Sequence, residues 1–536
     1  MPTRDPRRGS PPEPFIGVSM EHVEDLLQGH GFGPEMLGVG LDMMRTVVHR
    51  SLPKPPVSTA APLSLAGAAW VPGGADRISA LPEQVLRDII SRLPAADAAR
   101  TSALASRWRP LWRSAPLVVA DTHFLPNGRQ IALGVGEEES PGLADLVTRV
   151  LAAHPGPFRS VHLTRTAMDA HRGEIARWLD VLAAKGVQEL AFINRPWPLD
   201  IRLPATLFRC APLTRLFLSA WRLPDTAAVP RSAAFPNLRE LGLSLVAMED
   251  RDLAFLLDRS PVLEILTIVA AQVGVRLRLV SHSVRCVQLC YSILVDILVV
   301  DAPRLERLLQ WTWGLGSNSD KCCRVKIGHA PNLRAIGYLQ PGEHGLEIGN
   351  TAIKAGTKLS TSTLVPSVQN LALELTFQVR NDLKKVHNFL QCFPNVETLH
   401  IRSEKARGES TGKVGLKFWL EGGPITCIRQ HLKKIIFHDF RGSTNETAFL
   451  KFIAENARVL KNMVIVVSDW LLSSGVDARA ILKHLTCAKW ASGACKFQVF
   501  KSILREGERP VYGVLLASEV LPSDPFDKIY YREPLL

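Results

Sequence analysis

The feature that most constrains the fold is a short apolar template that recurs after residue 150. The template is Φ-x-x-Φ-x-Φ, in which Φ is an apolar residue. It begins at residues 158 (FRSVHL), 187 (VQELAF), 213 (LTRLFL), 238 (LRELGL), 263 (LEILTI), 284 (VRCVQL), 333 (LRAIGY), 368 (VQNLAL), 396 (VETLHI), 432 (LKKIIF) and 460 (LKNMVI), and LERLLQ at 305 fits except at its last position. Each match indicates a short strand with alternate residues buried, followed by a variable return segment.

The spacing of the template resembles that of leucine-rich repeats. Successive matches start about 21 to 36 residues apart, and Pro often precedes them, as in Ala-Pro at 211, 302 and 330 and Phe-Pro-Asn at 235 and 393. Because a chain with 46% hydrophobic residues matches such a template easily, an unrelated α/β fold is the alternative. We predict an α/β fold with an irregular leucine-rich solenoid of parallel β-strands over residues 150–420. The asparagine ladder of regular repeats is missing, which predicts irregular turns.

The template also predicts which side chains face the core. Leu241, Leu243 and Leu399 occupy Φ positions and should be buried. Arg239, Glu240 and Glu397 occupy x positions and should face water or a bound partner.

A different pattern, residues 76–112, precedes the repeats and predicts three short helices. Pro82 and Glu83 suit the first turn of a helix, on which apolar residues recur at helical spacing up to Leu93. Pro94 ends that helix, and Asp97 caps or opens the next. The third, LASRWRPLW, carries Trp108 and Trp112 on one face. Three helices in under about forty residues bury too little apolar surface without a partner.

The order and spacing of these residues resemble a plant F-box over residues 75–115. The resemblance rests on Asp76-Arg77-Ile78, Leu81-Pro82, Leu93-Pro94, Arg100-Thr101-Ser102 and Ser106-Arg107-Trp108-Arg109 with Trp112, while Ala80 and Pro110 depart from the usual pattern. It implies docking on the Skp-type adaptor of a cullin–RING ubiquitin ligase, an SCF complex. The residues expected to contact the adaptor are Leu81, Pro82, Val85, Leu86, Ile89, Leu93, Pro94, Leu104, Trp108 and Trp112. Ile90 and Leu111 fit adaptor contact and internal packing equally well.

Residues 421–470 resemble the FBD region that follows the repeats in many plant F-box proteins. The predicted pieces are a strand from Leu432 to Phe437, a polar turn at Arg441-Gly442-Ser443, an amphipathic helix and a strand from Met463 to Val467. The apolar face of the helix consists of Phe449, Phe452, Ile453, Ala457 and Leu460. Residues 471–536 form a C-terminal segment, and residues 1–74 a flexible extension rich in Pro, Gly and Ala.

Composition narrows the class of protein. The sequence contains no run of eighteen uncharged apolar residues, so we expect no membrane span. The charged, proline-rich N-terminus leads into no apolar segment, so we expect no signal peptide. The nine cysteines include no C-x-x-C pair, so we expect an intracellular protein of the nucleus, the cytoplasm or both. The net charge of +13 is spread along the chain, which makes nucleic acid an improbable partner.

No pattern predicts an enzyme active site. The segment ARGESTGKVG misses a phosphate-binding loop, because Gly408 stands one position too late and Val414 replaces the magnesium-binding hydroxyl. Cys322, Cys323 and His329 match no defensible zinc spacing. We therefore predict no catalytic residue, no cofactor and no metal ion.

The sequence as a whole favours a substrate-recognition subunit of an SCF-type ligase. The F-box would dock on the adaptor, and the repeats would bind an unknown target protein. The alternatives are a repeat-based scaffold that does not feed a ligase, including one that binds nucleic acid through its positive charge, and a receptor that responds to a small molecule.

Overall fold

The computed structural model describes most of the chain from residue 77 onwards. The described residues are 52–57, 77–125, 142–166, 168, 171–194, 201–230, 232–270, 275–292, 294–311, 323–405, 412–473, 481–483, 485, 487–503, 524–527 and 531–534. The predicted extension of residues 1–74 therefore lies outside the described residues, apart from the segment 52–57.

A large, mostly parallel β-sheet forms the spine of the molecule. Its fifteen strands, in spatial order, are β1 (Leu117–Ala120), β2 (Phe158–Leu163), β3 (Glu189–Ile193), β4 (Arg215–Ser219), β5 (Glu240–Ser244), β6 (Ile265–Val269), β8 (Cys286–Cys290), β10 (Arg307–Trp311), β12 (Ala335–Leu339), β15 (Asn370–Leu375), β16 (Thr398–Ser403), β17 (Lys434–Phe440), β18 (Asn462–Val467), β19 (Lys496–Ser502) and β20 (Tyr531–Pro534). Every match to the template overlaps one of these strands, so the prediction of a parallel-stranded α/β solenoid is confirmed.

Helices and a second sheet form the return segments. The helices are α6 (Leu143–Ala153), α7 (Arg172–Ala184), α8 (Asp250–Asp258), α9 (Arg380–Cys392), α10 (Leu416–Glu421), α11 (Thr444–Asn456) and α12 (Asp469–Ser473), with 3₁₀ turns η2 (Asp121–Phe124), η5 (Ala205–Arg209), η6 (Thr226–Ala228) and η7 (Thr361–Thr363) and a π turn η8 (Cys427–His431). In the middle of the array the return segments are strands, in the order β14 (Thr351–Ala352), β13 (His344–Ile348), β11 (Cys323–His329), β9 (Asp296–Asp301) and β7 (Arg276–Val280).

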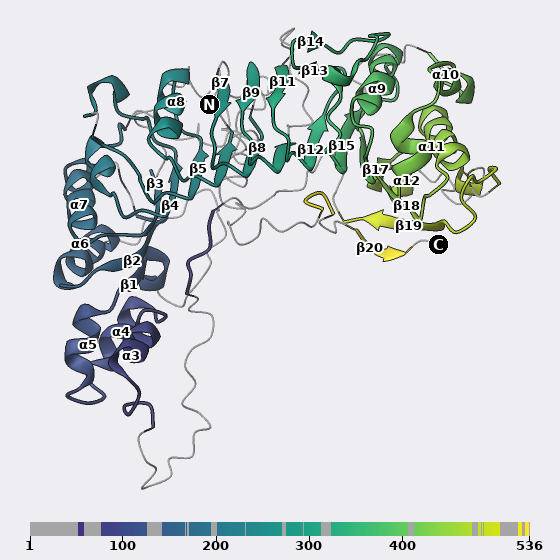
Figure 1. Cartoon of the computed structure of the whole chain (residues 1–536). Helices are drawn as coiled ribbons and strands as arrows, with labels where there is room; N and C mark the ends of the chain where they lie inside the picture. Colours follow the sequence, from purple (N-terminus) through teal and green to yellow (C-terminus); the bar gives the residue numbers. More distant parts are fainter. Residues whose placement is uncertain are drawn as a thin grey trace, which may run out of the picture.

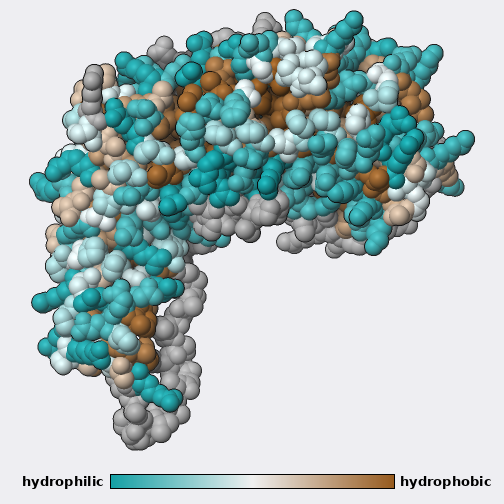
Figure 2. Space-filling view, viewed as in Figure 1, coloured by the Kyte–Doolittle hydropathy of each residue, from teal (hydrophilic) through white to brown (hydrophobic). Residues whose placement is uncertain are grey.

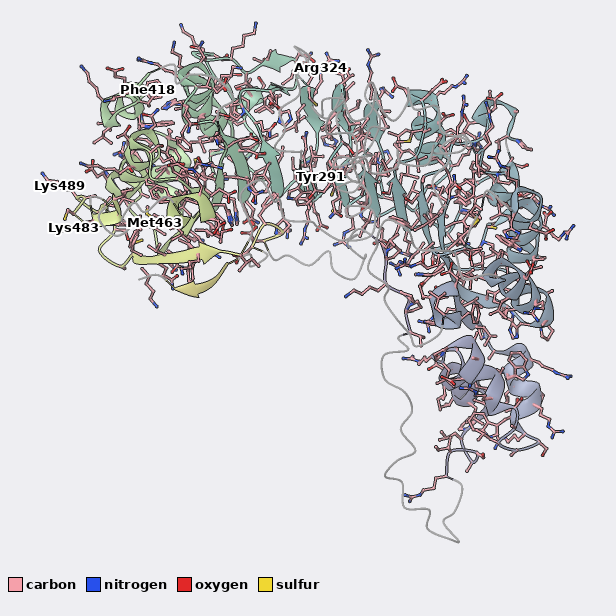
Figure 3. The ribbon with its side chains drawn as sticks, turned by 180° about the vertical axis from the view of Figure 1, so that it is seen from behind. Tyr291, Arg324, Phe418, Met463, Lys483 and Lys489 are labelled. Carbon is pink, nitrogen blue, oxygen red and sulfur yellow. The ribbon has the colours of Figure 1, made fainter. Side chains whose placement is uncertain are left out.

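The repeats stack into a curved band (Figure 1). A module of three helices, α3 (Glu83–Ile90), α4 (Ala95–Thr101) and α5 (Trp108–Ser114), lies beyond β1 at one end. The region around α11 and β18 lies at the other end, where Figure 3 labels Phe418 and Met463. Because β17, β18 and β19 pair in parallel with the strands before them, the C-terminal region continues the same sheet.

The turns that follow four strands are regular, and the expectation of irregular turns is wrong at these positions. Residues in the left-handed region, with φ of 58°, 50°, 49° and 53°, follow β4, β5, β6 and β8: Ala220, Leu245, Ala270 and Tyr291. Each donates its backbone N–H to the carbonyl oxygen of the last residue of the next strand, at 2.5 to 2.9 Å: Ser244, Val269, Cys290 and Trp311. These backbone hydrogen bonds connect successive turns, as an asparagine ladder does in regular repeats. They involve no side chain, so the sequence pattern does not reveal them.

The apolar Φ positions are buried as predicted, but the prediction that the x positions face outward is wrong within β5, β6, β8 and β10, where every residue is buried. Leu241, Leu243 and Leu399 are buried, each with 1% of its surface exposed, and Arg239 is exposed. Glu397 is half-buried. Glu240 is only 9% exposed, which corrects the prediction that it faces outward. It pairs with a basic residue of β4 and lies near Pro53, from the segment 52–57, beside a small cavity.

Candidate functional site

The helices of the N-terminal module begin where prolines place them. Pro82 and Pro94 have φ of −55° and −54° and directly precede α3 and α4. Proline suits a helix start, because its fixed φ is already helical and its missing N–H would have no partner within the helix. Helix α3 ends at Ile90 instead of Leu93, so Leu93 and Pro94 form the turn between the two helices.

Two of the predicted adaptor contacts belong to the core of the module. Leu86 is fully buried, and Trp108 is 4% exposed, with its Nε1 donating a 2.8 Å hydrogen bond to Oγ of Ser79. Both side chains therefore support the fold of the module itself, and their predicted contact with the adaptor stays a prediction. Ile90 and Leu111 are buried as well, which decides between their two interpretations in favour of internal packing.

The same module exposes large apolar side chains. Leu104 is 68% exposed and Val85 is 43% exposed, both as the predicted contact requires. Ile78, which the predicted contact set omitted, is 58% exposed. The remaining members of the set are exposed, as Pro82 is, or partly buried, as Leu81, Ile89, Leu93, Pro94 and Trp112 are. Figure 2 shows hydrophobic surface on this arm of the molecule.

Arg107 ties the apolar segments of the module together. Its guanidinium donates to the backbone carbonyl of Leu81 at 2.9 Å and to that of Ser79. The turn that carries Leu104 is thereby held against the segment that carries Ile78 and Leu81. The role of this arginine was not predicted, although an Arg beside a helix-forming Trp is visible in the sequence.

The module is joined to the repeat array by packing as well as by the chain. The ring of Trp112 lies 5.0 Å from that of His154, and His154 Nε2 is 3.2 Å from the carbonyl oxygen of Ala115. Pro94 forms a bridge to Val118 on β1, which pairs in parallel with β2. Trp112 therefore lies at the junction between module and array, and its predicted contact with an adaptor stays a prediction.

The later half of the array carries a second candidate surface. Four residues from far along the chain, Asp524-Pro525-Phe526-Asp527, lie against β12, β16 and β17; we call them the C-terminal tetrapeptide. Asp524 Oδ2 is 2.7 Å from Nε2 of His400, and Lys434 Nζ donates to Asp527 Oδ2 at 2.6 Å. The buried ring of Phe526 lies 5.5 Å from the rings of both Tyr338 and His400.

Charge and burial together set the protonation of this surface. Burial alone would raise the pKa of Asp524, but the charge and the hydrogen bond of His400 outweigh it and lower the pKa. Burial lowers the pKa of His438 far below its ordinary value, and the charge of Arg402 adds to the effect. Burial raises the pKa of Tyr338 to about 12. The surface thus presents a buried phenol and a neutral imidazole beside basic groups that hold carboxylates.

Comparison with protein families matches three parts of the chain. Residues 78–119 match the F-box domain, residues 175–401 match the leucine-rich repeats of FBD-associated F-box protein At5g56370, and residues 421–465 match the FBD region. The chain belongs to the F-box proteins with leucine-rich repeats and an FBD region. The three-helix module is the F-box, and the resemblance noted from its residues is confirmed.

Relatives named for two or more of these domains come from Arabidopsis thaliana. F-box/LRR-repeat protein 13 is 24% identical over 79% of this chain and 96% of its own length. FBD-associated F-box protein At5g60610 is 26% identical over 73% of this chain and 99% of its own length. A putative F-box/FBD/LRR-repeat protein, At4g00315, is 33% identical over 36% of this chain and 42% of its own length.

The division of this F-box protein into 1–74, 75–115, 150–420, 421–470 and 471–536 stays a prediction. Strand β1 already belongs to the large sheet and lies between the predicted end of the F-box and the predicted start of the repeats. The sheet also runs without interruption from β16 into the FBD strands β17 and β18. The large sheet therefore continues across boundaries between segments that differ in sequence composition.

Several histidine and cysteine side chains of this F-box protein lie within its described residues. Within them no group of three His, Cys, Asp or Glu residues could hold a metal ion, and no helix is long and apolar enough to cross a membrane. Cys322 lies outside the described residues, and His329 Nδ1 is 2.7 Å from Asp301 Oδ1. Burial raises the pKa of Cys210, Cys286, Cys392 and Cys427 to about 12, which keeps these thiols protonated and unreactive.

The segment that resembles a phosphate loop is only partly described. Residues 406–411 lie outside the described residues. Val414 is buried, and its backbone N–H donates to Oδ1 of Asn445 at 2.8 Å. This N–H is therefore engaged in holding the loop against α11.

Proposed function

We propose that this protein is the substrate-recognition subunit of an SCF-type ubiquitin ligase. Its F-box would dock on a Skp-type adaptor and through it on a cullin–RING ligase, and the repeat array would bind the protein to be ubiquitinated. The protein itself performs no chemistry in this role. It raises the effective concentration of target lysines near the conjugating enzyme, inside the cell, in the nucleus or the cytoplasm.

The exposed apolar side chains of the F-box carry the proposal. Ile78, Val85 and Leu104 are exposed within a span of fewer than about thirty residues, whereas the other large apolar side chains that the described residues expose are spread between residues 262 and 503. Several exposed apolar side chains on one small module favour a site of protein contact. A docked adaptor would remove these side chains from water at a gain of roughly 25 cal/mol per Å².

The junction with the array supports the same function. Because the F-box packs on the array through Trp112 and His154, a target bound to the array is held at a set position relative to the adaptor. Such a fixed geometry favours transfer, since proximity acts only when the reacting groups stay within reach. A scaffold that does not feed a ligase has no need of this arrangement.

The decisive experiment measures binding of the full chain to a purified Skp-type adaptor. Val85→Asp together with Leu104→Asp places charge on two exposed side chains and should weaken binding by at least about a hundredfold without unfolding the F-box. Val459→Asp is the matched control, because Val459 is similarly exposed, at 40%, but lies far along the chain after α11. This control should bind as the unsubstituted protein does.

Two outcomes contradict the proposal. Unchanged binding by the double variant would show that the adaptor does not use this surface. Absence of adaptor binding by the unsubstituted chain would favour the scaffold. Affinity purification with and without residues 76–112, followed by mass spectrometry, then separates ligase subunits from partners of the array.

A further inference from the structure

The contact between the C-terminal tetrapeptide and the sheet has the features of a peptide-binding site. Its two carboxylates are held by bases on different strands, Asp524 by His400 of β16 and Asp527 by Lys434 of β17. Between them the ring of Phe526, 1% exposed, is enclosed. Three residues thus supply an aromatic anchor with a charge-assisted contact on either side, the combination that gives short peptides both affinity and register.

The sheet is shaped for an aromatic ring at this point. Phe526 meets the ring of Tyr338 edge-on, at 74°, and that of His400 at 53°. Ala372 pairs with His400 in register across β15 and β16 and so faces the same side with only a methyl group. Arg402 lies over the ring of Tyr338, 5.4 Å from its centroid. The tyrosine is therefore held in place by the sheet itself.

The tetrapeptide does not use all the hydrogen-bonding capacity of the site. Tyr338 Oη, His400 Nδ1 and His438 Nε2 are buried and have no hydrogen-bond partner within the described part of the chain. The rings of His400 and His438 are stacked, with centroids 6.0 Å apart. A buried polar atom without a partner costs about 1–3 kcal/mol. A site that leaves several such atoms unsatisfied is only partly matched by its present occupant.

We propose that this surface of β12, β15, β16 and β17 binds a target peptide in which carboxylates flank a phenylalanine, and that the C-terminal tetrapeptide occupies it in place of the target. The inference rests on the proposed function in that the peptide belongs to the ligase target. The tetrapeptide acts as an intramolecular competitor. A target must displace it, and the unsatisfied polar atoms provide the additional contacts that make displacement favourable.

The test uses the full chain and a fluorescent peptide with the sequence of residues 520–531. In the unsubstituted protein the tethered tetrapeptide competes at an effective concentration of the order of millimolar, so the added peptide binds poorly. Phe526→Ala removes the anchor of the competitor and should tighten binding of the peptide at least about tenfold. A peptide with Ala in place of the phenylalanine should not bind either protein.

A matched pair of lysine variants locates the binding. In the Phe526→Ala background, Lys434→Ala should weaken peptide binding at least about tenfold, because it removes the partner of the second carboxylate. Lys433→Ala should leave binding unchanged, since Lys433 pairs instead with Glu397, at 2.8 Å. Equal effects of the two substitutions would overturn the proposal, as would a folded Phe526→Ala protein that fails to bind the peptide.

A second variant and a competing oligonucleotide provide two further measurements. If Phe526→Ala unfolds the protein, Asp527→Asn loosens the tetrapeptide without emptying the ring site and should tighten peptide binding a few-fold; no change would overturn the proposal. A single-stranded oligonucleotide that competes as well as the peptide would also overturn it, because the surface would then bind anions in general. None of these measurements includes the adaptor. The peptide site can therefore be disproved while the F-box still binds the adaptor, and adaptor binding can be disproved while the peptide site stands.

Discussion

Arg215 and Glu240 lie on neighbouring strands, β4 and β5, and Nε of Arg215 donates to Oε2 of Glu240 at 2.7 Å. A second carboxylate, that of Glu189 on β3, lies 3.4 Å from Nη1 of the same arginine. The three residues are paired in register, so one arginine joins three consecutive repeats. Similar pairs recur where Arg285 meets Glu306 and where Arg239 meets Glu264.

This pairing gives a graded prediction for three adjacent residues. Glu240→Ala should destabilise the array by about 1–2 kcal/mol, between the values for exposed and for buried ion pairs, because Glu189 still neutralises the arginine. Leu241→Ala should cost about 2–5 kcal/mol, and Arg239→Ala, at a largely exposed site, under about 1 kcal/mol. Thermal unfolding followed by circular dichroism ranks the three. Equal midpoints for Glu240→Ala and Arg239→Ala would show that the buried pair adds nothing.

The left-handed turn after β6 predicts how Ala270 responds to substitution. Ala270→Val should destabilise the protein by about 2 kcal/mol or more, because a β-branched residue fits poorly at a φ of 49° in a buried turn. Ala270→Gly should stay within about 1 kcal/mol of the unsubstituted protein, since relief of strain offsets the lost methyl group.

A strand alanine serves as the control for the turn. Ala191, equally buried on β3, has no left-handed strain, so Ala191→Gly should cost about 1–2 kcal/mol in denaturant unfolding. If Ala270→Gly proves as costly as Ala191→Gly, the left-handed turn stores no strain.

The close approach of the array to the F-box predicts the effect of a single methyl group. A Cβ at position 156 would lie 2.4 Å from the backbone carbonyl oxygen of Arg113 and 2.9 Å from Nε2 of His154. Gly156→Ala should therefore shift the junction and lower the free energy of unfolding by more than about 1 kcal/mol. Gly173→Ala, at a site with open space in α7, should be neutral or slightly stabilising. Similar unfolding curves for the two variants would contradict the contact.

A buried histidine predicts a loss of stability in mild acid. Burial lowers the pKa of His344 to about 4, and its Nδ1 accepts a 2.9 Å hydrogen bond from the backbone N–H of Gln340, which requires that nitrogen to be unprotonated. The unfolded chain has the ordinary histidine pKa of about 6.5 and binds the proton first. Stability is therefore complete above about pH 6.5 and falls as the pH drops towards 4, at up to about 1.4 kcal/mol per pH unit.

Replacing this histidine isolates its contribution. His344→Gln should make the unfolding midpoint less dependent on pH between 6.5 and 4, because it removes the contribution of one titrating histidine. His162, whose pKa burial lowers to about 3, supplies a separate contribution of the same sign that the variant keeps. An unchanged pH profile in the variant would mean that His344 takes up its proton without cost in the folded protein.

The features that the sequence predicts correctly depend on interactions between residues close together in the chain. The apolar template predicts the strands of the large sheet, and Pro82 predicts where the first helix begins. Asp97 was expected to cap or open the second helix, but α4 begins at Ala95, directly after Pro94.

The predicted amphipathic helix is α11, on which Phe449, Phe452 and Ile453 are buried. Ala457 and Leu460, which the predicted face also included, are buried but lie beyond the end of this helix. These features depend on neighbours within a few residues, which the sequence displays directly.

Features that join distant segments were decided only by the tertiary structure. The burial of Trp108 and Glu240, and the placement of Phe526 on a strand surface more than a hundred residues earlier, depend on which segments pack together. The return strands of the second sheet depend on pairing between repeats, and the left-handed turns on backbone hydrogen bonds. The amino-acid sequence by itself determined the repeat, the F-box and the side-chain chemistry. Packing decided which faces of those elements are covered, because the burial of a side chain depends on the segment that packs against it and not on the residue type alone.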